Sequence, residues 1–115
     1  MQDIATPKDI IKLVNAFYDF AAQDSQIGHF FKHINWQKHK PRMCMFWEFA
    51  LLEIPHPIGS IFDLHAKLPI KSIDFDHWIK LFDKTIDTNF KGPIANLAKQ
   101  KAKIIAYTFN AKMNA

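Results

Sequence analysis

Four long stretches of this chain carry apolar residues at the three- and four-residue spacing of an amphipathic helix. The first runs from Thr6 to about Asp24, and its apolar face holds Ile10, Leu13, Val14, Phe17, Tyr18 and Ala21. The others cover residues 35–53, 72–90 and 93–113. Such length and periodicity favour helices over strands. Three glycines are also few for the many turns of an all-β chain. We therefore expect an all-α fold of one domain, residues 1–115.

Helix-start and helix-stop residues separate these stretches. Thr6-Pro7-Lys8-Asp9 has a capping residue, a proline suited to the first helical position, and an acid facing the positive helix end. Asn35 and Ser72 are the expected caps of the second and third helices, and Gly92-Pro93 ends the third and starts the fourth. A short apolar turn at 27–31 follows the first helix.

Pro41 is the one residue that conflicts with this scheme. It falls inside the second stretch, where it removes a backbone hydrogen bond and disfavours helix at Lys40. Either the helix is kinked there, or Pro41 starts its regular part and residues 36–40 form a looser lead-in. In both cases we expect His39 to be weakly tethered and able to swing between the interior and solvent.

Between the two helical pairs lies an irregular connection with a histidine at its centre. Pro55, Pro57 and Gly59 precede it, Pro69 closes it, and His65 stands among apolar neighbours. There is room for one or two helical turns around His65. The imidazole is either a satisfied core histidine or the axial ligand of a buried metal cofactor. The 11 Phe and 3 Trp likewise fit either an aromatic core or a cavity for a large flat guest.

Composition and missing motifs exclude several functions. The net charge of +4 comes from scattered lysines, so no nucleic-acid footprint is indicated. The single Cys44 rules out an internal disulfide framework. We find no secretory leader and no apolar run long enough for a membrane span, and we expect a cytoplasmic protein. There is no glycine-rich phosphate loop, no GxSxG and no HExxH, and the His29/His33 spacing lacks further zinc ligands.

The remaining motifs, taken in their order along the chain, resemble those of one family, the truncated haemoglobins, and specifically their third group. The resemblance spans about Ile10 to Phe109 and rests on the order and spacing of Phe17-Tyr18, Asp24 to Gly28, Trp36-x-x-His39-Lys40, Phe46-Trp47, His65-x-x-Leu68-Pro69 and Trp78-Ile79-Lys80-Leu81-Phe82. It implies a two-over-two helical sandwich around haem b. The glycine pairs that mark helix ends in other truncated haemoglobins are absent, which fits the third group.

The resemblance also assigns roles to residues. His65 matches the iron ligand on the proximal side. The distal, ligand-binding positions match Tyr18, His39 and Trp78. Arg42 matches a cation near a haem propionate, and the other cofactor-binding positions are Phe31, Met43, Phe46, Leu64, Leu68, Phe75 and Trp78. From the residues alone, Tyr18 and Trp78 are equally well read as core side chains, His39 as solvent-facing, and His77 as a surface residue.

Three functions follow from these observations. The first is a monomeric haem protein that binds O2 and other diatomic ligands, tightly if Tyr18 and Trp78 both donate to the ligand. The second is a haem redox enzyme, acting on nitric oxide or peroxide and served by a separate reductase. The third is a cofactor-free helical interaction module.

Overall fold

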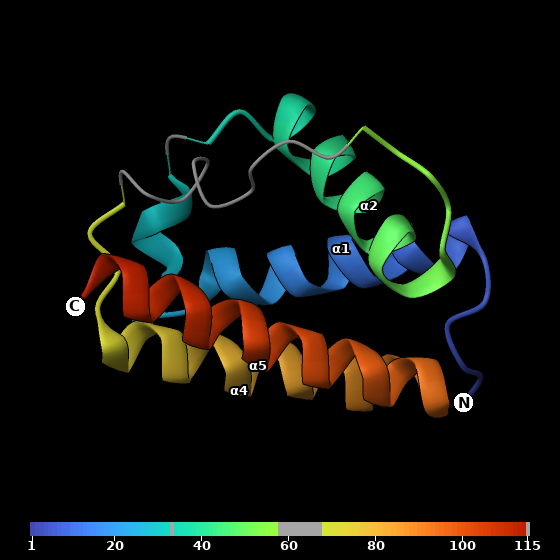
Figure 1. Ribbon diagram of the computed structural model, residues 1–115. Coiled ribbons are helices and arrows are strands. Elements are labelled where there is room, and N and C mark those ends of the chain that lie inside the picture. The colour runs from blue at the N-terminus through green and yellow to red at the C-terminus, as the bar shows by residue number, and fades with distance from the viewer. Residues whose placement is uncertain (33, 58–67, 115) are drawn as a thin grey trace.

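The computed structural model describes residues 1–32, 34–57 and 68–114 (Figure 1). Its helices are α1 (Pro7–Gln23), η1 (Gly28–Phe31), α2 (Trp36–Leu52), α4 (Ser72–Asn89) and α5 (Pro93–Met113). The all-α prediction and the four long helices are confirmed, with boundaries close to the expected ones. The apolar turn expected at 27–31 is a single 3-10 turn, η1.

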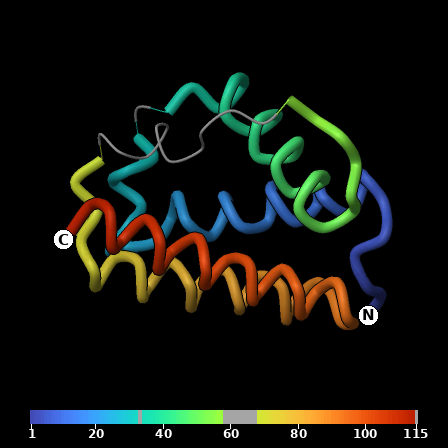
Figure 2. Tube along the Cα trace, in the orientation of Figure 1, coloured from blue at the N-terminus to red at the C-terminus, as the bar shows by residue number. Residues whose placement is uncertain are grey.

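The long helices form two packed pairs. α4 and α5 lie side by side in opposite directions, joined by the short link at 90–92, and α1 packs against both α4 and α2 (Figures 1 and 2). The core lies between the pairs and includes the fully buried Leu13, Phe82, Ile86 and Ala98. This arrangement leaves the inner faces of α1, α2, α4 and α5 directed towards one shared interior.

Acidic side chains fix the starts of α1 and α4. The Asp9 carboxylate accepts hydrogen bonds from the backbone N–H groups of Ala5 (2.9 Å) and Thr6 (3.0 Å). At α4 the prediction that Ser72 caps the helix is wrong. The capping position is Lys71, and Ser72 is already helical. The Asp74 carboxylate accepts the Lys71 backbone N–H at 3.0 Å. An acid three residues beyond the cap stabilises both the unpaired N–H groups and the positive helix end.

Pro41 is accommodated inside a continuous α2. The helix begins regularly, because the backbone N–H of His39 donates to the Asn35 carbonyl at 2.9 Å. The prediction that residues 36–40 form a looser lead-in is therefore wrong. The prolyl nitrogen forfeits only its own bond to the preceding turn.

The N-terminal segment is bound to the turn between α4 and α5. The Asp3 carboxylate accepts the backbone N–H groups of Ile94 (3.0 Å) and Ala95 (2.8 Å), the first turn of α5. Gly92 has φ of 148°, and a Cβ there would lie 2.5 Å from the Asp3 side chain, so glycine is required on both counts. Desolvation opposes ionisation of Asp3, but backbone donors from Ile94, Ala95 and Ile4 outweigh it and hold its pKa below the ordinary value.

Across residues 1–32, 34–57 and 68–114, no helix has the length and apolarity needed to cross a membrane. The short helical element predicted around His65 falls on residues 58–67 and lies outside the described residues.

Candidate functional site

An apolar cavity of about 200 Å³ lies between the helix pairs. All four long helices, η1 and the segment at 68–70 contribute to its wall. The described lining residues are Leu13, Val14, Phe17, Tyr18, Ile27, Phe30, Phe31, Ile34, His39, Met43, Phe46, Trp47, Leu68, Ile70, Asp74, Phe75, Trp78, Phe82, Ile105, Ala106 and Phe109. Few of these side chains are polar, which is typical of ligand cavities whose polar groups orient a mainly apolar guest.

Tyr18 and His39 supply a polar pair to this apolar wall. The Tyr18 hydroxyl oxygen lies 2.9 Å from His39 Nε2, and the Tyr18 side chain is buried. Desolvation, together with the nearby Cys44 thiol, raises the pKa of Tyr18 well above its ordinary value. The phenol therefore keeps its proton at physiological pH and remains a hydrogen-bond donor.

Aromatic rings surround this pair. The Tyr18 ring meets Trp36 edge-on at a centroid distance of 4.8 Å and Phe31 at 5.8 Å. On the other side, Phe17 contacts Tyr18 at 5.4 Å and Trp78 at 5.5 Å. These contacts fix the direction of the Tyr18 hydroxyl and of the Trp78 indole, because each ring is held by neighbours on more than one helix.

The cavity brings together most of the predicted site residues that the structure describes. Its wall includes Tyr18, Phe31, His39, Met43, Phe46, Leu68, Phe75 and Trp78. His39 lies in the wall, while its swing towards solvent stays a prediction. Arg42 is exposed on α2 and is not among the lining residues, so its role at a propionate also stays a prediction. His65, Leu64 and His33 lie outside the described residues.

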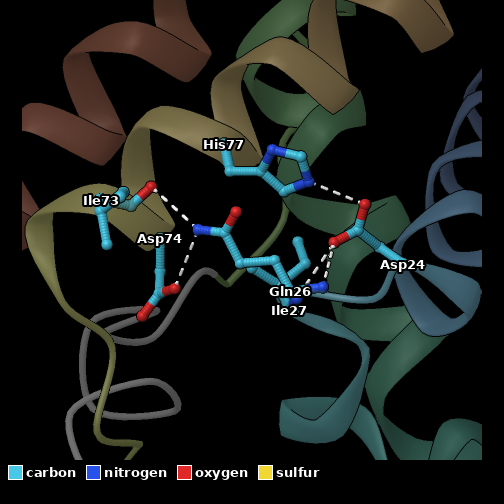
Figure 3. Close-up of polar contacts among 6 residues, drawn as sticks. All are labelled: Asp24, Gln26, Ile27, Ile73, Asp74 and His77. Atoms are coloured by element: carbon cyan, nitrogen blue, oxygen red, sulfur yellow. Dashed lines mark hydrogen bonds and ion pairs between the residues drawn. The ribbon is translucent and has the colours of Figure 1, made fainter.

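A hydrogen-bonded pair, Asp24 with His77, joins the end of α1 to α4 (Figure 3). His77 Nε2 lies 2.7 Å from Asp24 Oδ2, while Asp24 Oδ1 accepts the backbone N–H groups of Gln26 (2.9 Å) and Ile27 (3.1 Å). Burial alone would raise the pKa of the Asp24 carboxyl. The His77 bond and the two backbone donors outweigh burial and lower it. The interpretation of His77 as a plain surface residue is therefore wrong.

A second contact strengthens the same junction. The Gln26 side-chain amide donates to the Ile73 carbonyl at 3.3 Å and to Asp74 Oδ1 at 3.2 Å (Figure 3). Asp74 also lines the cavity and caps α4. The turn that carries Ile27 into the cavity wall is thus tied to the helix that carries Trp78.

Sequence reasoning missed part of the wall. Ile105, Ala106 and Phe109 of α5 line the cavity, as do Phe30 of η1 and Asp74 of α4. The α5 residues belong to the apolar stripe of that helix, but periodicity shows only that they are buried and not what they face. The sequence predicted Asp74 as an acid at the start of a helix, but nothing in its spacing indicated that it would also line the cavity.

The residue types fit a haem. Both faces of a porphyrin are apolar. In globins the iron is held by a histidine imidazole on one side, and the polarity of the side chains on the other side controls ligand binding. The described wall offers aromatic and aliphatic side chains for the ring, with the Tyr18–His39 pair and the Trp78 indole as polar groups. No lysine or arginine lines the described part of the wall, so any cation for the propionates must come from its rim or from elsewhere in the chain.

The chain is similar to truncated haemoglobins both in sequence and in structure. No family model matches the chain. A curated relative, the group 3 truncated hemoglobin ctb of Campylobacter jejuni, is 28% identical over 109 residues, covering 89% of this chain and 86% of that protein. The crystal structure of a group III truncated hemoglobin from Campylobacter jejuni superposes with a TM-score of 0.86 at 26% identity, covering 98% of this chain and 95% of that one. The truncated-globin fold expected from the resemblance is thereby confirmed. In sequence and in fold the chain is therefore similar to truncated haemoglobins of the third group, and this similarity implies a haem-binding globin.

Proposed function

We propose that this chain binds haem b in the cavity, with His65 as the iron ligand, and that it holds O2 and other diatomic ligands tightly. The observation that carries this proposal is the Tyr18–His39 pair, a buried phenol and an imidazole 2.9 Å apart in an otherwise apolar wall. When bound, the haem supplies the iron at which a diatomic ligand attaches. The chain supplies the cavity, the hydrogen-bond donors and the exclusion of water.

His39 acts on the ligand through Tyr18. When Nε2 of His39 carries a proton, it donates to the Tyr18 oxygen and leaves the phenolic hydrogen available to a ligand. When Nε2 carries none, the phenol donates to it and is occupied. The 2.9 Å contact therefore allows Tyr18 to serve as a donor in one tautomer and withdraws it in the other. His39 is thus a positioning residue for the donor.

Trp78 is the second proposed donor. Its indole N–H can only donate, and its ring is held by Phe17 at 5.5 Å and by Phe82 at a stacked 5.5 Å. A hydrogen bond to a ligand that takes on negative charge contributes about 1.5–3 kcal/mol, which corresponds to about tenfold to a hundredfold in release rate. Two such donors favour retention of O2 over easy delivery, which supports scavenging or redox chemistry rather than storage.

Redox chemistry is the second candidate function. Nitric oxide dioxygenation or peroxidase-like turnover fits the same cavity and would draw electrons from a separate reductase or donor. The observation that favours it is the contact between Tyr18 and the half-buried Trp36, at a ring-centroid distance of 4.8 Å.

The proposal is tested by loading the purified protein with haem and recording ferric, ferrous and ligand-bound absorption spectra. We expect a Soret band that saturates at one haem per chain. His65→Ala should lose or weaken haem binding, whereas His56→Ala should keep it, because His56 bonds Glu48 at 3.2 Å and does not line the cavity.

Two results would count against the proposal. A protein that takes up no haem would support the cofactor-free helical module instead. Unchanged haem affinity and spectra in His65→Ala would remove His65 as the iron ligand. We also propose a monomer in the cytoplasm, and size-exclusion chromatography of the haem-loaded protein tests the first of these.

A further inference from the structure

Trp36, Tyr18 and His39 form a compact cluster that leads from the cavity wall towards the outside. Trp36 is half-buried at the start of α2, whereas Tyr18 is buried. The centroid distances are 4.8 Å from Tyr18 to Trp36, 5.3 Å from Tyr18 to His39 and 5.8 Å from Trp36 to His39. Ligand retention explains Tyr18 and His39, but it gives Trp36 no role.

The three residue types have complementary redox chemistry. Tyrosine and tryptophan side chains can each lose one electron and be restored. A buried phenol must lose its proton together with the electron, because burial disfavours every charged form of the group. His39 Nε2 lies 2.9 Å from the Tyr18 oxygen, and in the tautomer in which Nε2 carries no hydrogen it can take that proton. Electron tunnelling falls steeply with distance, so rings in contact exchange electrons readily.

We propose that Tyr18 and Trp36 form an electron relay out of the haem cavity, with His39 as the proton acceptor, and that small phenols are oxidised at Trp36. The inference rests on the proposed haem function and gives it a substrate class. Hydrogen peroxide is the oxidant.

The relay supplies two electrons, one at a time, to each peroxide. Reduction of one H2O2 to two H2O consumes two electrons and two protons. Each electron is withdrawn from Tyr18 while its proton passes to His39 Nε2. Trp36 then gives an electron to Tyr18, which recovers its proton from His39, and the Trp36 indole releases its N–H proton to solvent. A phenol returns one electron and one proton to Trp36, so that two phenols become two phenoxyl radicals per peroxide.

The surroundings of Trp36 fit its proposed role as the outer end of the electron relay. Lys40 Nζ lies 5.8 Å from the centroid of the indole, and a nearby cation disfavours a positively charged ring. Oxidised Trp36 therefore gives up its proton and is neutral, which matches a donor that returns a proton and an electron together. Phe31 stacks on the indole at 5.9 Å and holds it in place, and the exposed part of the ring remains open to an aromatic donor.

The test treats the haem-loaded protein with one equivalent of hydrogen peroxide. Radicals are recorded by electron paramagnetic resonance after rapid freezing, and oxidised residues are mapped by peptide mass spectrometry. We expect an indole radical and oxidation at Trp36. Trp36→Phe should lose both and leave a tyrosyl radical, whereas Tyr18→Phe should lose oxidation at Trp36.

Tyr107→Phe is the matched control, because it makes the same change as Tyr18→Phe at a residue that is 79% exposed and does not line the cavity. It should retain the Trp36 radical. Haem-free protein under the same peroxide should show no Trp36 oxidation. Two results would overturn the relay while leaving haem binding intact. One is a protein that shows a Soret band but keeps Trp36 unmodified after peroxide, and the other is a radical spectrum that is unchanged in Trp36→Phe. Absence of a Soret band overturns both.

Discussion

Removal of the Asp24 carboxylate should loosen the junction between α1 and α4 that positions the cavity wall. Asp24→Ala deletes the acceptor of three hydrogen bonds, those from His77 and from the backbone N–H groups of Gln26 and Ile27. The Asp24 side chain is only 14% exposed, so water replaces these bonds incompletely. At about 1 kcal/mol for each bond, the free energy of unfolding should fall by about 3 kcal/mol.

The corresponding thermal shift follows from chain length. With an unfolding entropy of about 2.1 cal/mol/K per residue, a loss of about 3 kcal/mol lowers Tm by roughly 12 °C in a chain of this size. Urea unfolding monitored by circular dichroism measures the free energy, and a thermal scan measures the shift. Asp19→Ala is the control, because Asp19 is exposed on the same helix. A difference below about 0.5 kcal/mol between the two variants would refute the argument, since that is the usual range for surface substitutions.

The same carboxylate has a defined pH dependence. Its pKa is lowered in the folded protein, so its contribution is fully present above its unfolded pKa of about 3.9 and is lost as pH falls through the lower folded value. The stability gap between wild type and Asp24→Asn should therefore shrink in acid and stay constant above about pH 5. A gap that grows in acid would show that the ionised carboxylate is not the stabilising form.

Three further substitutions test separate parts of the structure. Asp3→Ala should destabilise the protein by about 1–2 kcal/mol in urea unfolding, because the Asp3 carboxylate accepts two N–H groups of the first turn of α5, as a capping side chain does; an unchanged midpoint would contradict that role. Phe82→Ala, at 2% exposure, should cost about 3–5 kcal/mol, whereas Ile104→Ala, at 65% exposure, should cost little; equal losses would refute the assignment of the core. His39→Leu should speed ligand release more than His39→Gln, because an amide keeps a donor for the Tyr18 oxygen, and identical rates would show that His39 does not orient Tyr18.

The long helices were predictable because their signals are local. Pro7 and Asp9 determine where α1 begins, and Gly92 with Pro93 determines where α5 begins. At α4 the local signal was ambiguous. Serine is a favoured cap, yet the Asp74 carboxylate accepts the backbone N–H of Lys71. The capping position therefore lies one residue earlier, at Lys71. Pro41 was harder still, because the pattern alone could not decide between a break and a continuous helix.

Long-range contacts explain what sequence reasoning missed in the site. Asp24 and His77 are separated by 53 residues, and no periodicity on α4 reveals that His77 meets an acid at the end of α1. Asp3 reaches α5 across 91 residues in the same way. The Tyr18–His39 pair could be expected only from the resemblance, since each residue alone fits an ordinary core or surface position.

The rate at which O2 leaves the ferrous, haem-loaded protein tests the account most directly. Stopped-flow displacement of O2 should give slow release from the wild type. Tyr18→Phe should release O2 about tenfold to a hundredfold faster, because it deletes one charge-assisted donor. Tyr107→Phe, at a residue that is 79% exposed, should match the wild type. Equal rates for wild type and Tyr18→Phe, or wild-type release as fast as that of a storage globin, would contradict the claim that this cavity holds its ligand through Tyr18.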